Sequence, residues 1–172
     1  MRAVILSPGP SLATYTPQSA DVIIAVNRAA LAHACDVWAA LDYPMIRDNA
    51  VKVRGTPNLL SRQQTITDLK PPRLTRFPNV IAVESLFEFC PPNLMPWTLF
   101  TMTCAMIYAA YLGTNAIDIY GADFKGTQDY DGVEAGERRT EERWERDEKP
   151  LYARVKAWIE ARGISVTRHE RT

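Results

Sequence analysis

The strongest constraint on the fold is a series of short apolar runs rich in Val and Ile, each followed by a turn or a helical stretch. The runs expected to form strands are residues 3–7, 22–27, 37–42, 80–84, 116–120 and 164–167. Several of them are apolar without strict alternation, which is typical of a parallel sheet covered on both faces. The segments expected to form helices are residues 28–34, about 98–112 and 151–162. This alternation predicts an α/β sandwich with a mostly parallel sheet of about six strands.

The final helix has the clearest pattern. One helical face carries Leu151, Val155, Trp158 and Ile159. Pro150 suits a first helical turn, and Gly163 can end the helix. We therefore expect this helix to pack its apolar face against the sheet.

Two segments fit the alternation less well. Residues 44–78 contain several prolines among mixed charges, which indicates an irregular excursion or a short extra strand. Residues 125–149 begin with turn residues and become densely charged. This second segment is either a solvated loop and helix face or a lid over a site.

Length, charge and cysteine count limit the class of protein. A chain of 172 residues is expected to form one domain over residues 1–172. Lys plus Arg and Asp plus Glu both number 20, so the balance gives no reason to expect nucleic acid as a partner. The three cysteines have an odd count and no CxxC spacing, so reduced thiols are expected. No secretion signal is evident, which favours a cytoplasmic location.

Residues 89–117 carry no charged side chain and nearly reach the length of a membrane span. The segment contains Pro96, Gly113 and Asn115, and a strand-like run follows it directly. We therefore expect a helix buried inside the domain and no membrane span.

The first expected strand ends in the turn SPGPSL. Ligands of open parallel sheets bind beyond the carboxyl ends of the strands, so this turn is a candidate binding element. Gly9 permits close backbone approach, and Ser11 offers a hydroxyl and an N–H to an anion. Pro8 and Pro10 lack N–H groups, so the turn cannot be a donor-rich phosphate loop. The turn is either a plain connection or part of a ligand site.

Polar residues follow other expected strands. Asn27 either caps the next helix or uses its amide to read a base or ribose edge. Asp42 either forms a turn or binds ribose or a divalent cation. Asp123, in the sequence GADF, poses the same choice. Thr101 and Thr103 lie in the first turns of the long apolar helix, so all these groups could face one crevice.

Four segments occur in a recognisable order: ILSPGPSL, VIIAVNRA, WAALDYPMI and AMIYAAYLGTNAIDIYGADF. Together they resemble the small bacterial sialyltransferases that act on lipooligosaccharide, and the related 6-hydroxymethylpterin diphosphokinase-like family. The resemblance covers about residues 3–47 and 98–124. It implies a three-layer Rossmann-like sandwich that binds a nucleotide, which is a CMP-sugar in the first family and ATP in the second.

The resemblance also implies roles for individual residues. Those implied to contact the nucleotide are Gly9, Ser11, Asn27, Asp42, Thr101, Thr103 and Gly121. Asp123 is implied to line the base and sugar side, and Tyr130 to match a tyrosine that steadies the leaving phosphate. In a transferase, Lys125 and Tyr130 would neutralise the charge that develops on the phosphate, so Asp123, Lys125 and Tyr130 are the candidate catalytic residues. Asp42 stands where the sialyltransferases usually have Asn, and a carboxylate there could help hold Mg²⁺ beside phosphates, as in the diphosphokinase-like relatives.

The sequence departs from the sialyltransferase pattern at functional positions. Pro8 replaces an Asn of the first turn, and Lys125 replaces the first of two tyrosines that contact the phosphate. The family's catalytic histidine is expected shortly before the closing helix, but residues 145–147 contain none. The carboxylates considered as an alternative general base are Asp129, Asp131 and Glu145.

Three functions follow from these observations. The first is a nucleotide-dependent transferase that moves a glycosyl or diphosphoryl group. The second is a protein that binds a nucleotide or signalling molecule without turning it over, which the missing histidine favours. The third is an assembly protein that retains the fold, and a homo-oligomer is possible in any of the three.

Overall fold

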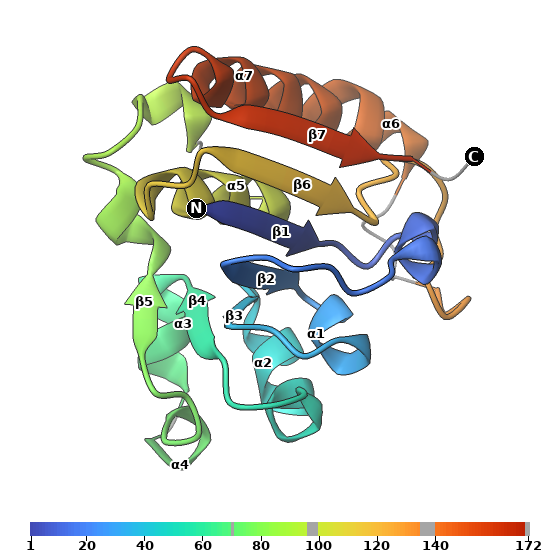
Figure 1. Ribbon diagram of the computed structural model, residues 1–172. Coiled ribbons are helices and arrows are strands. Elements are labelled where there is room, and N and C mark those ends of the chain that lie inside the picture. The colour runs from blue at the N-terminus through green and yellow to red at the C-terminus, as the bar shows by residue number, and fades with distance from the viewer. Residues whose placement is uncertain (70, 96–99, 135–139, 171–172) are drawn as a thin grey trace.

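The computed structural model describes residues 1–69, 71–95, 100–134 and 140–170, and within them the chain forms one parallel sheet of seven strands. The strands are β1 (Arg2–Leu6), β2 (Val22–Val26), β3 (Val37–Ala39), β4 (Asn58–Ser61), β5 (Val80–Ala82), β6 (Ala116–Tyr120) and β7 (Ser165–His169). Their order in the sheet is β5-β4-β3-β2-β1-β6-β7, and every neighbouring pair is parallel (Figure 1). The predicted fold class is confirmed.

The strand missing from the sequence prediction is β4, within the proline-containing segment 44–78. Of the two alternatives for that segment, the short extra strand is correct. Leu59 and Leu60 of β4 are fully buried between β3 and β5. Only four residues are extended, and the helix that begins at Gln63 follows almost at once, which is why the strand signal is weak.

The helices lie between and after the strands. They are α1 (Ala29–Ala32), α2 (Tyr43–Asn49), α3 (Gln63–Asp68), α4 (Pro71–Leu74), α5 (Thr101–Tyr111), α6 (Glu141–Arg143) and α7 (Lys149–Glu160), with a π-helical turn η5 (Trp144–Glu148) that joins α6 to α7. Short 3₁₀ helices are η1 (Pro10–Thr14), η2 (Ala50–Lys52), η3 (Val83–Leu86) and η4 (Pro92–Leu94). The expected start of the long apolar helix, which includes Thr98, lies outside the described residues.

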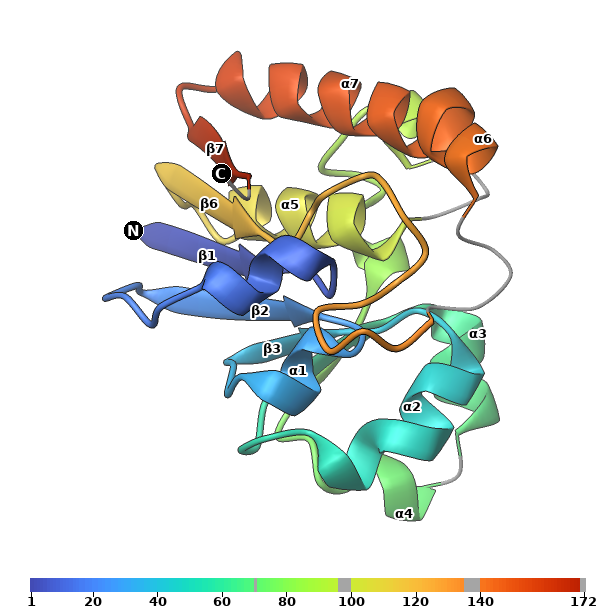
Figure 2. The ribbon, with the colours of Figure 1, turned by 90° about the vertical axis from the view of Figure 1, so that its right-hand side faces the viewer.

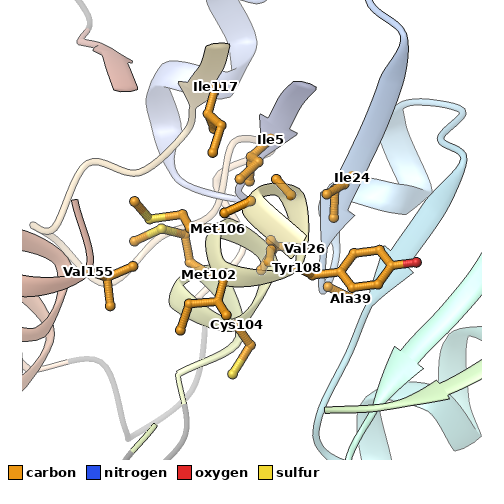
Figure 3. Close-up of a cluster of buried hydrophobic side chains, with 14 of the residues drawn as sticks. Ile5, Ile24, Val26, Ala39, Met102, Cys104, Met106, Tyr108, Ile117 and Val155 are labelled. Carbon is orange, nitrogen blue, oxygen red and sulfur yellow. The ribbon is translucent and has the colours of Figure 1, made fainter. Parts of the chain in front are cut away.

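Helix α5 is the centre of the first core layer. All its residues from Met102 to Ala110 are buried, so the expectation of a helix inside the domain is confirmed. It packs with α7 against one face of the sheet, where Ile5, Ile24 and Ile117 of the strands belong to the same cluster of buried side chains (Figure 3). Among the described residues, no helix is both long and apolar enough to cross a membrane.

The opposite face of the sheet carries a second hydrophobic cluster. Leu6, Trp38 and Leu59 point to this side, and η1, α1 and α2 cover them. Trp38 is fully buried, and its indole Nε1 donates a 2.8 Å hydrogen bond to the carbonyl of Asn27 at the end of β2. The two clusters on either side of one sheet make the fold a three-layer sandwich.

A polar network covers the β1–β6–β7 part of this second face. Asp118 of β6 accepts a 2.8 Å hydrogen bond from Arg2 Nε and lies 2.8 Å from His169 Nε2. The His169 ring stacks on Tyr120 with a centroid distance of 4.2 Å. Burial opposes ionisation of Asp118, but the hydrogen bonds from Arg2 and His169 outweigh it and lower the pKa of the carboxyl.

The Asp118 network predicts a pH-dependent contribution to stability. Because the pKa is lower in the folded state, the contribution is present above the unfolded pKa and is lost as the pH falls through the folded pKa. Asp118→Asn should lower the free energy of unfolding by about 1–2 kcal/mol at pH 7, and the difference should shrink below about pH 4. Urea unfolding across pH measures this, with the exposed Asp68→Asn as control. An equal loss at pH 3 and pH 7 would contradict the assignment.

Candidate functional site

The turn after β1 packs directly against the turn after β6. Gly9 donates a 2.9 Å backbone hydrogen bond to Gly121, and Ser7 donates one of 2.8 Å to Tyr120. A Cβ atom added to Gly9 would lie 2.4 Å from the carbonyl oxygen of Gly121 and 2.5 Å from Asp123 Oδ2. Gly9 has an ordinary φ of −68°, so close approach, rather than backbone conformation, requires glycine at this position.

Ser11 and Asp123 hold these two turns together. The backbone N–H of Ser11 donates a 2.8 Å hydrogen bond to Asp123 Oδ2, and Ser11 Oγ accepts a 3.1 Å bond from the N–H of Gly121. Ser11 is only 1% exposed. Its polar groups therefore serve the architecture of the site, and it does not line the cavity described below.

Asn27 follows β2 in a left-handed conformation, with a φ of 49°. Asn is one of the few residues other than glycine that adopts this conformation readily. The side chain does not cap α1, whose N-cap is Arg28. Instead, the Asn27 Oδ1 atom is buried, and within the described part of the chain it has no hydrogen-bond partner. A buried amide oxygen without a partner is costly, so a ligand that donates to it would remove that cost.

A cavity of about 470 Å³ opens at the carboxyl ends of the strands. This volume lies in the range of small-molecule and cofactor sites. The residues predicted from the sequence that line it are Gly9, Asn27, Asp42, Thr101, Gly121, Asp123 and Lys125. Residues far apart in the chain thus meet in one crevice, at the position that an open parallel sheet uses for ligands.

Two other predicted residues do not line the cavity. Thr103 is buried, and its hydroxyl donates a 3.0 Å hydrogen bond to the carbonyl of Phe100. Tyr130 donates its backbone N–H to the carbonyl of Pro8 at 2.7 Å. Burial is the main cause that raises the pKa of the Tyr130 phenol. Both residues support the walls of the site.

The start of α5 forms the floor of the cavity. Thr101 and Met102, in its first turn, both line the cavity. The first N–H groups of a helix have no partner within the helix, and the helix dipole makes this end favourable for anions. A phosphate in the cavity would therefore meet a positive electrostatic potential at this end of the helix.

The loop after β6 closes one side of the cavity. It runs across the carboxyl ends of the strands toward α1 (Figure 2). Arg28 fastens it there, since its guanidinium contacts Asp129 at 3.0 Å and Asp131 at 2.6 Å. Lys125, Asp129 and Glu134 of this loop line the cavity. For the described part of the loop, this favours the second interpretation of residues 125–149, a lid over a site, over a solvated loop.

Several lining residues were not predicted from the sequence. They are Arg62 after β4, Phe100 before α5, and Arg143, Trp144 and Glu148 from the helix that precedes α7. The last three come from α6 and the π-helical turn. A π-turn has an i to i+5 repeat, and it brings the side chains of Arg143 and Glu148 together, with Nε 3.2 Å from Oε1. The sequence carries no signal for such a turn, although π-turns occur often at functional sites.

Neither histidine of the chain lines the cavity. His33 follows α1 and contacts the Tyr15 ring, while His169 belongs to the Asp118 network on the sheet. Of the carboxylates considered as a base, Asp129 lines the cavity and Asp131 and Glu145 do not. Within the described residues, no three side chains among His, Cys, Asp and Glu are grouped so as to hold a metal ion. The Asp42 metal site therefore stays a prediction.

Comparison with known proteins supports the fold. No protein-family model and no curated protein sequence matches this chain. A solved structure, described as the sialyltransferase CST-II in complex with trisaccharide acceptor and CMP, superposes with a TM-score of 0.62 at 12% sequence identity. The match covers 98% of this chain and 80% of that one. The chain thus has a sialyltransferase-like fold.

Proposed function

We propose that the cavity binds a cytidine nucleotide sugar and that the protein is a glycosyltransferase. The observation that carries this proposal is Asn27, a residue of the cavity lining beside the β1 turn and the start of α5, whose buried Oδ1 has no hydrogen-bond partner among the described residues. The amide group of Asn can donate and accept at once, so it suits a ribose hydroxyl or a base edge. The fold likeness to CST-II, a sialyltransferase solved with CMP, supports the same ligand class.

Cationic and anionic groups of the cavity are assigned to different parts of the nucleotide. The first turn of α5 and the side chains of Arg62 and Lys125 provide positive potential for the nucleotide phosphate. Asp42 is exposed at the cavity rim after β3, where its carboxylate can accept hydrogen bonds from ribose hydroxyls. In this proposal residues 1–172 form one nucleotide-binding domain.

A non-catalytic nucleotide-binding protein is the second candidate. It is favoured by one observation, the absence of both histidines from the cavity lining. The two candidates predict the same ligand but differ in turnover, so CMP release from a CMP-sugar separates them.

A thermal-shift panel tests the ligand class. CMP, CDP, CTP and a CMP-sugar should raise the melting temperature without Mg²⁺, because a ligand at a hundred times its dissociation constant adds about 2.7 kcal/mol of stability. ADP, ATP and GTP serve as comparison nucleotides. A shift given only by ATP with Mg²⁺ would instead favour the diphosphokinase-like alternative. No shift with any nucleotide would refute the proposed function.

A further inference from the structure

We propose that Glu148 is the general base of the transfer reaction and that Arg143 is its positioning residue. This inference rests on the proposed glycosyl transfer and names the group that accepts the proton of the acceptor hydroxyl. It differs from the sequence prediction, which considered Asp129, Asp131 and Glu145. The carboxylates of the cavity differ in how they are held.

Two cavity carboxylates have architectural partners. Asp123 Oδ2 accepts the N–H of Ser11 and so links the β1 and β6 turns. Asp129 is 2% exposed at its side chain, and its Oδ2 accepts a hydrogen bond from Arg28. A group that must take a proton from an incoming hydroxyl has to reach that hydroxyl, so these two carboxylates are poorly suited.

Two further carboxylates lie in less suitable places. Glu134 belongs to the loop after β6, where its Oε1 accepts a 3.1 Å hydrogen bond from Gln128, and it is exposed. Asp42 follows β3, on the opposite side of β1 from β6 and α7, and it is also exposed. Solvent competes with an acceptor substrate at both positions.

Glu148 combines partial burial with a fixed orientation. Its side chain is 17% exposed and lines the cavity, so it borders the ligand space but is shielded from bulk solvent. The π-helical turn brings it beside Arg143, whose Nε holds Oε1 at 3.2 Å. The Arg143 guanidinium lies over the Phe100 ring, 5.0 Å from its centroid, directly before α5. Phe100 thus supports Arg143, and Arg143 orients the Glu148 carboxylate.

The proposed step forms one bond, breaks one bond and transfers one proton. The acceptor oxygen forms a bond to the anomeric carbon of the donor sugar, and its proton moves to the Glu148 carboxylate. The bond between the anomeric carbon and the phosphate oxygen breaks, and CMP leaves with that electron pair. The positive potential at the α5 terminus stabilises the leaving phosphate.

The test compares Glu148→Gln with Glu145→Gln in the full chain. Glu145 lies on the same helix but is 60% exposed, pairs with Lys149 and does not line the cavity. With CMP-N-acetylneuraminic acid and a lactose acceptor, Glu148→Gln should release CMP about 100-fold or more slowly, whereas Glu145→Gln should stay within about twofold of wild type. Both variants should bind CMP within about twofold of wild type, since Glu148 acts on the acceptor.

Two further variants separate catalysis from structure. Glu148→His should restore part of the rate and lose it again below about pH 6.5, because an imidazole base protonates there. Glu148→Asp keeps the charge but shortens the reach of the carboxylate by one methylene, so it should release CMP about tenfold more slowly than wild type. This variant tests the role of Glu148 if Glu148→Gln proves unstable. A variant without the carboxylate that turns over at the wild-type rate would overturn the inference alone. A wild type that binds CMP but releases none from the donor would overturn the inference together with the proposed transferase activity, and would leave the nucleotide site standing. A wild type that does not bind CMP would overturn the proposed function as well.

Discussion

Gly121→Ala is expected to lower the free energy of unfolding by about 3–4 kcal/mol, the largest loss from a single methyl group at this site. Gly121 has a φ of 74°, and an added Cβ would lie 1.8 Å from the carbonyl oxygen of Ser7 and 2.7 Å from its carbonyl carbon. These are backbone atoms, and the N–H of Ser7 is bonded to Tyr120, so the β1 turn cannot shift away without breaking its link to β6. Urea unfolding measures the loss.

Gly113→Ala is the matched control for this prediction. Gly113 has nearly the same φ, 78°, but an added Cβ there would meet no atom within 4 Å. Gly113→Ala should lower the free energy of unfolding only by the cost of a left-handed backbone conformation for alanine, about 1–2 kcal/mol. Equal losses for the two variants would show that the contact between the β1 and β6 turns contributes nothing beyond the backbone conformation.

Asn27→Gly is expected to weaken CMP binding by about 30-fold while leaving the fold intact. Glycine accepts the φ of 49° at least as well as Asn does, so the backbone keeps its conformation and its carbonyl still accepts the Trp38 indole. The substitution removes the side-chain amide, whose Oδ1 has no partner in the part of the chain that the structure describes. The lost hydrogen bonds between the amide and the ligand contribute about 2 kcal/mol, which corresponds to this change in the dissociation constant. Titration calorimetry can measure it.

The control for this variant is Asn79→Gly. Asn79 is exposed before β5 and bonds to Asn58, away from the cavity lining. It should leave CMP affinity unchanged. If Asn27→Gly binds CMP as tightly as wild type, Asn27 serves only the backbone turn, and the observation that carries the proposed function is lost.

The fold was predictable because both faces of its sheet are covered. Strands such as Val22–Val26 and Ala116–Tyr120 are apolar enough to be recognised, and the uncharged segment around α5 reads correctly as a buried helix. The strand β4 was left open because only Leu59 and Leu60 carry its apolar signal. A strand this short is stabilised by the strands that pair with it, here β3 and β5, and the sequence alone does not show that pairing.

The site was predictable where it follows strand ends and at Thr101, in the first turn of the long apolar helix. Asn27, Asp42 and Gly121 come after strands, and the topology of a parallel sheet brings them to one edge. The distinction between lining and supporting residues could not be predicted, because Ser11 turns its hydroxyl toward a backbone N–H and not toward the cavity. Glu148 could not be predicted either, since a regular α-helix would not place it beside Arg143.

The most direct test of the central claim is hydrogen exchange of the wild-type protein with and without saturating CMP. With CMP bound, exchange should be slower in the peptides that surround the cavity, which cover residues 5–12, 24–29, 100–105 and 120–125. Peptides from residues 155–164, which lie in α7 and the turn before β7, should not change. Protection confined to such distant segments, or no change anywhere, would contradict a nucleotide site at the carboxyl ends of β1, β2 and β6.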